Sequence, residues 1–218
     1  MPVAFLFDLD GVIVDTAYYH YLAWQRLADE LGFSFTEKDN EGLKGVSRMQ
    51  ALDILLELGG LNFSETEKVD LAARKNRWYV AYLETLDKSH ILPGAAAFIA
   101  DTRKMGIKIA LGSASKNART ILEKLQLQSS FDAIVDGTMT TRAKPDPEVF
   151  QLGASMLGVS PKQCVVFEDA QAGIEAALSA GMIPVGIGRA ENLKGAALVT
   201  PNLEPYTAES LLKKLKLI

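Results

Sequence analysis

The sequence predicts an α/β protein whose parallel sheet carries an inserted, all-helical segment. Two observations lead to this fold class. Short apolar runs alternate with helical patterns over most of the chain, and strands that alternate with helices form βαβ units with right-handed crossovers. The alternation is interrupted after the first apolar run, because residues 15–91 contain helical patterns but no convincing strand.

The predicted strands are short apolar runs. The first, Val3–Leu9, ends in acidic residues and Gly11, which is typical of a buried strand that carries polar side chains at its tip. The other four predicted strands are Ile107–Leu111, Ala133–Val135, Cys164–Phe167 and Pro184–Ile187.

Helical patterns fill the spaces between these runs, at Ala95–Met105, Asn117–Leu125, Pro147–Leu157 and Ala170–Ala180. Pro93-Gly94 marks the start of the first helix, and Asp146-Pro147 is typical of an N-cap followed by proline at the first helical position. The lysine-rich tail after Ser210 is interpreted as a solvated helix face.

The inserted segment has helical patterns at Thr16–Leu31, Ser47–Leu58 and Glu65–Leu86. Ser64 and Glu67 have the spacing of a capping box at the start of the third. We therefore expect a discontinuous core of residues 1–14 and 92–218, and a helical cap of residues 15–91.

Composition excludes several classes of protein. Of 218 residues 48% are hydrophobic and 23% are charged, with a net charge of −4 and no basic patch, so we expect no nucleic-acid partner. No apolar stretch has the length of a membrane span, and the first residues do not resemble a signal peptide. The single cysteine, Cys164, permits no internal disulfide. A cytoplasmic protein is expected.

Polar side chains follow several predicted strands, and in an open parallel sheet ligands bind beyond the carboxyl ends of the strands. Four carboxylates gathered at one edge would repel one another, and Mg²⁺ would relieve the repulsion where substrates carry phosphate. The residues expected at this edge are Asp8, Asp10, Gly11, Ser113, Ala114, Ser115, Lys116, Asn117, Lys144, Glu168 and Asp169.

Four of these segments resemble, in order, the four motifs of the haloacid dehalogenase superfamily: Asp8-Leu9-Asp10-Gly11, Ser113, Lys144-Pro145-Asp146-Pro147 and Glu168-Asp169. Each motif alone is weak, but the four together extend over nearly the whole chain. The resemblance implies a Rossmann-like core of the superfamily type with an inserted α-helical cap.

Within the superfamily the chain is most similar to the β-phosphoglucomutase family. The first motif is followed by His20 and Trp24, as in that family, and the cap carries a similar Leu43–Arg48 loop. Further likeness lies in Ser113–Asn117 and in Arg74-Lys75-Asn76.

By this resemblance, Asp8 is the nucleophile that forms an aspartyl-phosphate, and Asp10 is the general acid and base. Ser113 and Lys144 would neutralise charge on the phosphoryl oxygens. The implied Mg²⁺ ligands are Asp8, the backbone carbonyl of Asp10, Glu168 and Asp169.

The resemblance also implies substrate-binding residues. Arg48 would hold the second phosphate, with contacts from Lys116 and Asn117. His20 and Lys75 would link the cap to Asp10, and Thr16 would lie at the hinge. The full implied set is Thr16, His20, Lys44, Gly45, Val46, Ser47, Arg48, Lys75, Ala114, Ser115, Lys116 and Asn117.

The implied reaction interconverts β-glucose 1-phosphate and glucose 6-phosphate through β-glucose 1,6-bisphosphate, with Mg²⁺ as cofactor and the bisphosphate as activator. A monomer that binds a small sugar phosphate is expected. A phosphatase with the same nucleophile is the first alternative. A non-catalytic phosphosugar-binding module is the second, and retention of both Asp8 and Asp10 disfavours it. Taken singly, Ser113 could cap a helix, and Arg48 could face solvent.

Overall fold

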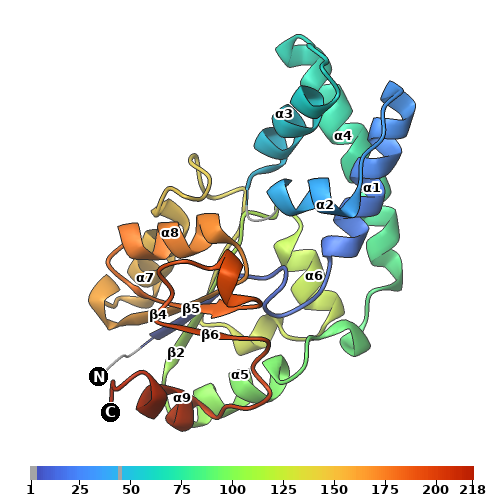
Figure 1. The fold of residues 1–218 in the computed structure, drawn as a ribbon. Coiled ribbons are helices and arrows are strands. Elements are labelled where there is room, and N and C mark those ends of the chain that lie inside the picture. Colours follow the sequence, from blue (N-terminus) through green and yellow to red (C-terminus); the bar gives the residue numbers. More distant parts are fainter. Residues whose placement is uncertain (1–3, 44–45) are drawn as a thin grey trace.

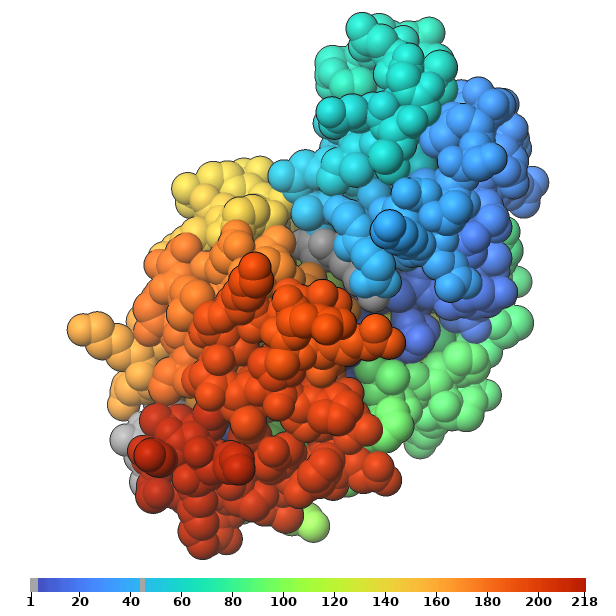
Figure 2. All heavy atoms as spheres, in the orientation of Figure 1, coloured from blue at the N-terminus to red at the C-terminus, as the bar shows by residue number. Residues whose placement is uncertain are grey.

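The computed structural model describes residues 4–43 and 46–218, so the predictions for Lys44 and Gly45 lie outside the described residues. Figure 1 shows a sheet flanked by helices, with α1, α3 and α4 standing together at one end of it. In the space-filling view this helical part, blue to cyan, forms a narrower lobe against the yellow-to-red part of the core (Figure 2). The predicted fold class is confirmed.

The sheet has six parallel strands in the order β3-β2-β1-β4-β5-β6. All five predicted strands are present, and β6 was missed. The strands are β1 (Ala4–Phe7), β2 (Lys108–Gly112), β3 (Ala133–Val135), β4 (Cys164–Glu168), β5 (Ile183–Ile187) and β6 (Leu198–Thr200).

Helices cover both faces of the sheet, because successive side chains of a strand point to opposite faces. Phe5 and Phe7 of β1 pack in one apolar cluster with α5, α6 and α9, whereas Ala4 and Leu6 pack in another with α7 and α8. These helices are α5 (Ala95–Lys104), α6 (Ala118–Lys124), α7 (Glu148–Leu157), α8 (Gln171–Ser179) and α9 (Ala208–Lys214).

Two helix starts show how local sequence sets the boundaries. Gly94 precedes α5 with a φ of 80°, a conformation that glycine adopts without strain. Helix α7 begins at Glu148, one residue later than predicted, with Pro147 in the N-cap position. The Asp146 carboxylate still accepts a hydrogen bond from the Glu148 amide at 2.9 Å.

The inserted segment has its own core around Trp24, Leu27, Leu52 and Leu55. The predicted Ser64–Glu67 capping box is present. The three long helices were predicted and the short α2 was not, and the third helix ends at residue 82 rather than 86. The helices are α1 (Ala17–Leu31), α2 (Glu37–Asn40), α3 (Arg48–Leu58) and α4 (Glu65–Tyr82); the short 3-10 turns are Glu41–Leu43, Leu83–Thr85 and Lys88–His90.

The two chain crossings between the parts lie side by side, because Val14 and Ile91 form an isolated antiparallel bridge. The predicted domain boundaries at 14/15 and 91/92 fall at this bridge and stay a prediction. Ala23 and Tyr79, at the base of the helical part, belong to the same apolar cluster as β1. In the part of the chain that the structure describes, no helix combines the length and apolarity needed to cross a membrane.

Candidate active site

Three adjacent strands carry the predicted catalytic side chains to one edge of the sheet. Asp8 follows β1, Ser113 follows β2, and Glu168 ends β4. On one side of β1 the strand order continues through β2 to β3, and on the other side it continues through β4 and β5 to β6. The order therefore reverses between β1 and β4, and ligands of open parallel sheets bind at such a topological switch point.

Three carboxylates meet at this point. Ligand oxygens of Asp8, Glu168 and Asp169 lie within 4.8 Å of one another. A cluster of hard oxygen donors suits Mg²⁺, which is bound through a few carboxylates and keeps sites for water and phosphate. The residues present therefore fit the implied metal.

Lys144 ties two of these carboxylates together. Its Nζ donates to Asp8 Oδ1 at 2.6 Å and also to Glu168 Oε1, and the side chain is 1% exposed. Burial alone would lower the pKa of Lys144, but the charges of Asp8 and Glu168 raise it above its ordinary value. Lys144 is therefore a permanent cation that balances the carboxylates from within the protein.

Two glycines make room for the carboxylates. Gly11 has a φ of +78°, and a Cβ there would lie 2.0 Å from Asp169 Oδ2. A Cβ on Gly173, in α8, would lie 1.9 Å from the Glu168 carboxyl. Burial raises the pKa of Glu168 to about 7 although the charge of Lys144 opposes the shift, so its negative charge depends on a nearby cation.

Asp10 is placed for proton transfer. Its carboxylate accepts a hydrogen bond from the Thr16 hydroxyl. Burial first, and the charge of Asp8 second, raise the pKa of Asp10 to about 8. A carboxyl group that holds its proton near neutrality can protonate a leaving oxygen and later take a proton back.

The helical part contributes a buried basic pair. Lys75 Nζ lies 2.8 Å from His20 Nδ1 and 4.3 Å from the centre of the Trp24 ring. Burial lowers the pKa of Lys75 well below its ordinary value, and the charge of Arg48 adds to the effect. Burial, followed by the charge of Lys75, likewise lowers the pKa of His20.

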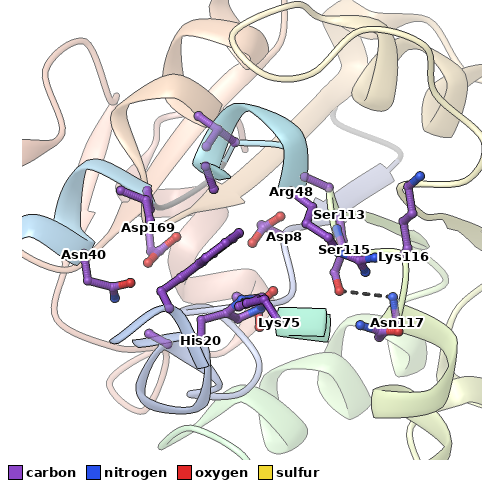
Figure 3. Close-up of a pocket in the computed structure, with 17 residues that line it drawn as sticks. Asp8, His20, Asn40, Arg48, Lys75, Ser113, Ser115, Lys116, Asn117 and Asp169 are labelled. Atoms are coloured by element: carbon purple, nitrogen blue, oxygen red, sulfur yellow. Dashed lines mark hydrogen bonds between the residues drawn. The ribbon is translucent and has the colours of Figure 1, made fainter. Parts of the chain in front are cut away.

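The loop after β2 is held in place by a chain of hydrogen bonds. The Ser113 hydroxyl accepts from the Ser115 amide at 3.1 Å. The Ser115 hydroxyl accepts in turn from the Asn117 amide at 3.2 Å (Figure 3). The Asn117 side chain donates to Asn76 of α4 at 3.0 Å. The loop therefore links the sheet edge to the helical part.

These groups line one pocket between the sheet edge and the helical part. Figure 3 shows Asp8 near its middle, with Asn40 and Asp169 on one side and Lys116 and Asn117 on the other. The predicted residues that line it are Asp8, Asp10, His20, Val46, Arg48, Lys75, Ser113, Ala114, Ser115, Lys116, Asn117 and Asp169.

Of the implied catalytic, metal-binding and substrate-binding residues that the structure describes, four do not line this pocket. Lys144 and Glu168 are buried beside Asp8, and Thr16 is fully buried against Asp10. Ser47 lines a neighbouring groove, where its hydroxyl caps α3 by accepting from the Gln50 amide. Their implied roles stay predictions.

Sequence reasoning missed several lining residues. The missed apolar lining residues are Trp24, Leu43, Ala51 and Ala17, the last of which begins α1. Asn40 also lines the pocket, and its position at the end of an unpredicted four-residue helix gave no signal in the sequence.

Comparison with known proteins agrees with this geometry. Residues 3–181 match the family of haloacid dehalogenase-like hydrolases. The chain belongs to that family.

Among members of the family, the chain is similar to a β-phosphoglucomutase of Bacillus subtilis, with 43% identity over 95% of this chain and 93% of the relative. It is also similar to a phosphorylated carbohydrates phosphatase of Thermotoga maritima, with 34% identity over 82% of each chain. A crystal structure of β-phosphoglucomutase from Clostridium difficile matches with a TM-score of 0.95 and 46% identity, over 99% of this chain and 98% of the other.

Proposed function

We propose that the chain is a β-phosphoglucomutase, which interconverts β-glucose 1-phosphate and glucose 6-phosphate through β-glucose 1,6-bisphosphate. The two relatives with that name match nearly the full length at 43% and 46% identity, whereas the phosphatase relative matches at 34%. A monomer in the cytoplasm, with a core of residues 1–14 and 92–218 and a cap of 15–91, belongs to the proposal.

The observation that carries the proposal is that Arg48 lies in the pocket without a carboxylate partner among the described residues. Its half-buried guanidinium lines the same pocket as Asp8, and among residues 4–43 and 46–218 no carboxylate pairs with it. A partly buried cation without a counter-ion is ready to bind an anion. A mutase must bind a bisphosphate, so it needs such an anion site beside the reacting one, and Lys116 can add to it.

The core residues account for the phosphoryl transfer. An Asp8 carboxylate oxygen attacks phosphorus, an O–P bond forms, and the phosphorus–oxygen bond to the sugar breaks. Asp10 gives its proton to the departing sugar oxygen. In the other half-reaction Asp10 removes the proton from the 6-hydroxyl of β-glucose 1-phosphate, whose oxygen attacks the phosphorus on Asp8. The O–P bond to Asp8 breaks, which forms the bisphosphate and frees Asp8.

The surrounding residues would balance the charge of the phosphoryl group and exclude water from the site. Mg²⁺ held by Asp8, Glu168, Asp169 and the Asp10 carbonyl would neutralise the transferring phosphoryl group when bound. Ser113 donates to a phosphoryl oxygen, and Lys144 holds the Asp8 carboxylate in position through its hydrogen bond. The helical cap excludes water, which would otherwise hydrolyse the aspartyl-phosphate. His20 and Lys75 connect cap position to Asp10, and Lys44 through Ser47 complete the sugar site.

The test supplies β-glucose 1-phosphate with Mg²⁺ and a trace of β-glucose 1,6-bisphosphate. The proposal predicts glucose 6-phosphate as product and a rate that depends on the bisphosphate. Steady release of inorganic phosphate, with no gain from the bisphosphate, would instead establish the phosphatase alternative.

A further inference from the structure

Asn40 is a largely buried residue whose side chain faces the pocket and has no hydrogen-bond partner among the described residues. Its side chain is 7% exposed, and it lines the pocket. Within residues 4–43 and 46–218 the structure gives its side-chain amide no hydrogen bond, while its backbone amide donates to Thr36 at 3.1 Å. The Asn40 amide is not among the described side-chain atoms that are wholly buried without a partner, so it reaches the pocket, where a ligand can satisfy it.

The position of Asn40 is fixed from both sides. Before it, Thr36 and Asp39 form a capping box, in which the Thr36 amide donates to Asp39 Oδ2 at 2.9 Å. After it, Leu43 is buried in the core of the helical part. The backbone that carries the amide is therefore held on both sides, which favours specific recognition.

The chemistry of Asn40 differs from that of the other polar groups in the pocket. Arg48 and Lys116 are cations that suit phosphate, and the carboxylates suit a metal ion. The amide of Asn117 is already bonded to Asn76. Asn40 offers two donors and an acceptor without charge, and a sugar hydroxyl, which both donates and accepts, is their natural complement.

We propose that Asn40 is a specificity-determining residue that hydrogen-bonds a ring hydroxyl of the sugar phosphate. The proposal rests on the proposed function, because it takes a sugar phosphate as the ligand. In Figure 3 the Asn40 side chain enters from the Asp169 side of the pocket, opposite Lys116, which leaves the phosphate-binding cations free for the other end of the substrate. A site that hydrogen-bonds a hydroxyl rejects analogues that lack it, because its own polar group is then left unpaired.

The experiment compares the unaltered chain with Asn40→Leu on β-glucose 1-phosphate and on its 2-, 3- and 4-deoxy analogues, with kcat/KM as the readout. For the unaltered chain, kcat/KM on one of the analogues should be roughly tenfold to a hundredfold lower than on β-glucose 1-phosphate. For Asn40→Leu, kcat/KM on β-glucose 1-phosphate should fall by a similar factor, and replacing that substrate by the same deoxy analogue should cause no further fall. Asn40→Ala, which adds no apolar branch, gives the same pattern.

Asn192→Leu is the matched control, because it makes the same chemical change at an exposed position and leaves kcat/KM unchanged. Equal losses on the parent and on every analogue would show a merely structural role and overturn the proposal, as would an unchanged kcat/KM on the parent. If the unaltered chain hydrolyses these sugar phosphates without isomerising them, the proposed function fails. The same comparison, with hydrolysis as the readout, then still decides the role of Asn40.

Discussion

At the scale of the residue, the site depends on how a few buried charges are balanced. Lys144 compensates Asp8 and Glu168 in a region where none of the three side chains is more than 8% exposed. The sequence correctly predicted that a lysine, a hydroxyl and several carboxylates would meet. It could not show that Lys144 is sealed behind the pocket, because burial is set by residues distant in the chain.

Replacement of Lys144 by Met is expected to lower the free energy of unfolding by about 3–5 kcal/mol in metal-free buffer, because two buried carboxylates lose their counter-ion. Urea denaturation measures the change. Lys213→Met is the control: Lys213 makes an ion pair of 2.6 Å with Glu209 on the exposed face of α9, and its loss should cost at most about 1 kcal/mol. Equal costs in the two variants would mean that Lys144 is not an essential counter-charge.

His20 gives a prediction on pH. Its pKa in the folded protein is lowered, by burial first and then by the charges of Lys75 and Arg48. Below the ordinary value of 6.5 the unfolded chain therefore binds more protons at this position, so stability falls as the pH falls. Between pH 7.5 and 5.5 the unaltered protein should lose about 1 kcal/mol more than His20→Gln in urea denaturation. Identical pH dependence in the two proteins would contradict the shift.

At the scale of the element, strand and helix ends determine which side chains reach the site. The long periodic segments were predicted, since their patterns extend over many residues. Strand β6 and helix α2 were not, because three and four residues are too short to show a period. The omission of α2 had a consequence, because Asn40 ends that helix and was missed with it.

A substitution in helix α8 separates helix propensity from the space that the site requires, because the two favour different residues at position 173. Alanine favours a helix interior over glycine by about 1 kcal/mol, but a Cβ at Gly173 would overlap the Glu168 carboxyl. Gly173→Ala should therefore weaken Mg²⁺ activation at least roughly tenfold, as changes around metal ligands do. A titration of activity against Mg²⁺ measures it. Gly42→Ala, with nothing within 4 Å of the new Cβ, should behave as the unaltered chain does. An unaffected titration for Gly173→Ala would show that Glu168 is free to move.

At the scale of the whole molecule, the strand order places the carboxylates of β1 and β4 next to each other, and the helical part covers the edge where they meet. Right-handed crossovers and the switch point of a parallel sheet made this convergence predictable from the order of the elements. The contact between Asn117 and Asn76 was not predictable, because it depends on how the cap is oriented on the core.

Metal binding should stabilise the whole fold, because the carboxylate cluster exists only when β1 and β4 are paired. At an Mg²⁺ concentration of about 100 times Kd, the gain is about 2.7 kcal/mol, seen as a higher Tm that EDTA reverses. Asp169→Asn should lose most of the gain, whereas Asp53→Asn, on the exposed surface of α3, should keep it. A gain that survives in Asp169→Asn would locate the metal elsewhere.

The most direct test of the covalent role proposed for Asp8 looks for the phosphoryl group on its side chain. The protein is mixed with β-glucose 1,6-bisphosphate and Mg²⁺, quenched in acid within a turnover, and its peptides are analysed by mass spectrometry. An acid-stable, hydroxylamine-sensitive phosphate is expected on the peptide that contains Asp8, and none is expected in Asp8→Asn, which should also show no turnover. Phosphate on another residue, or undiminished turnover by Asp8→Asn, would contradict it.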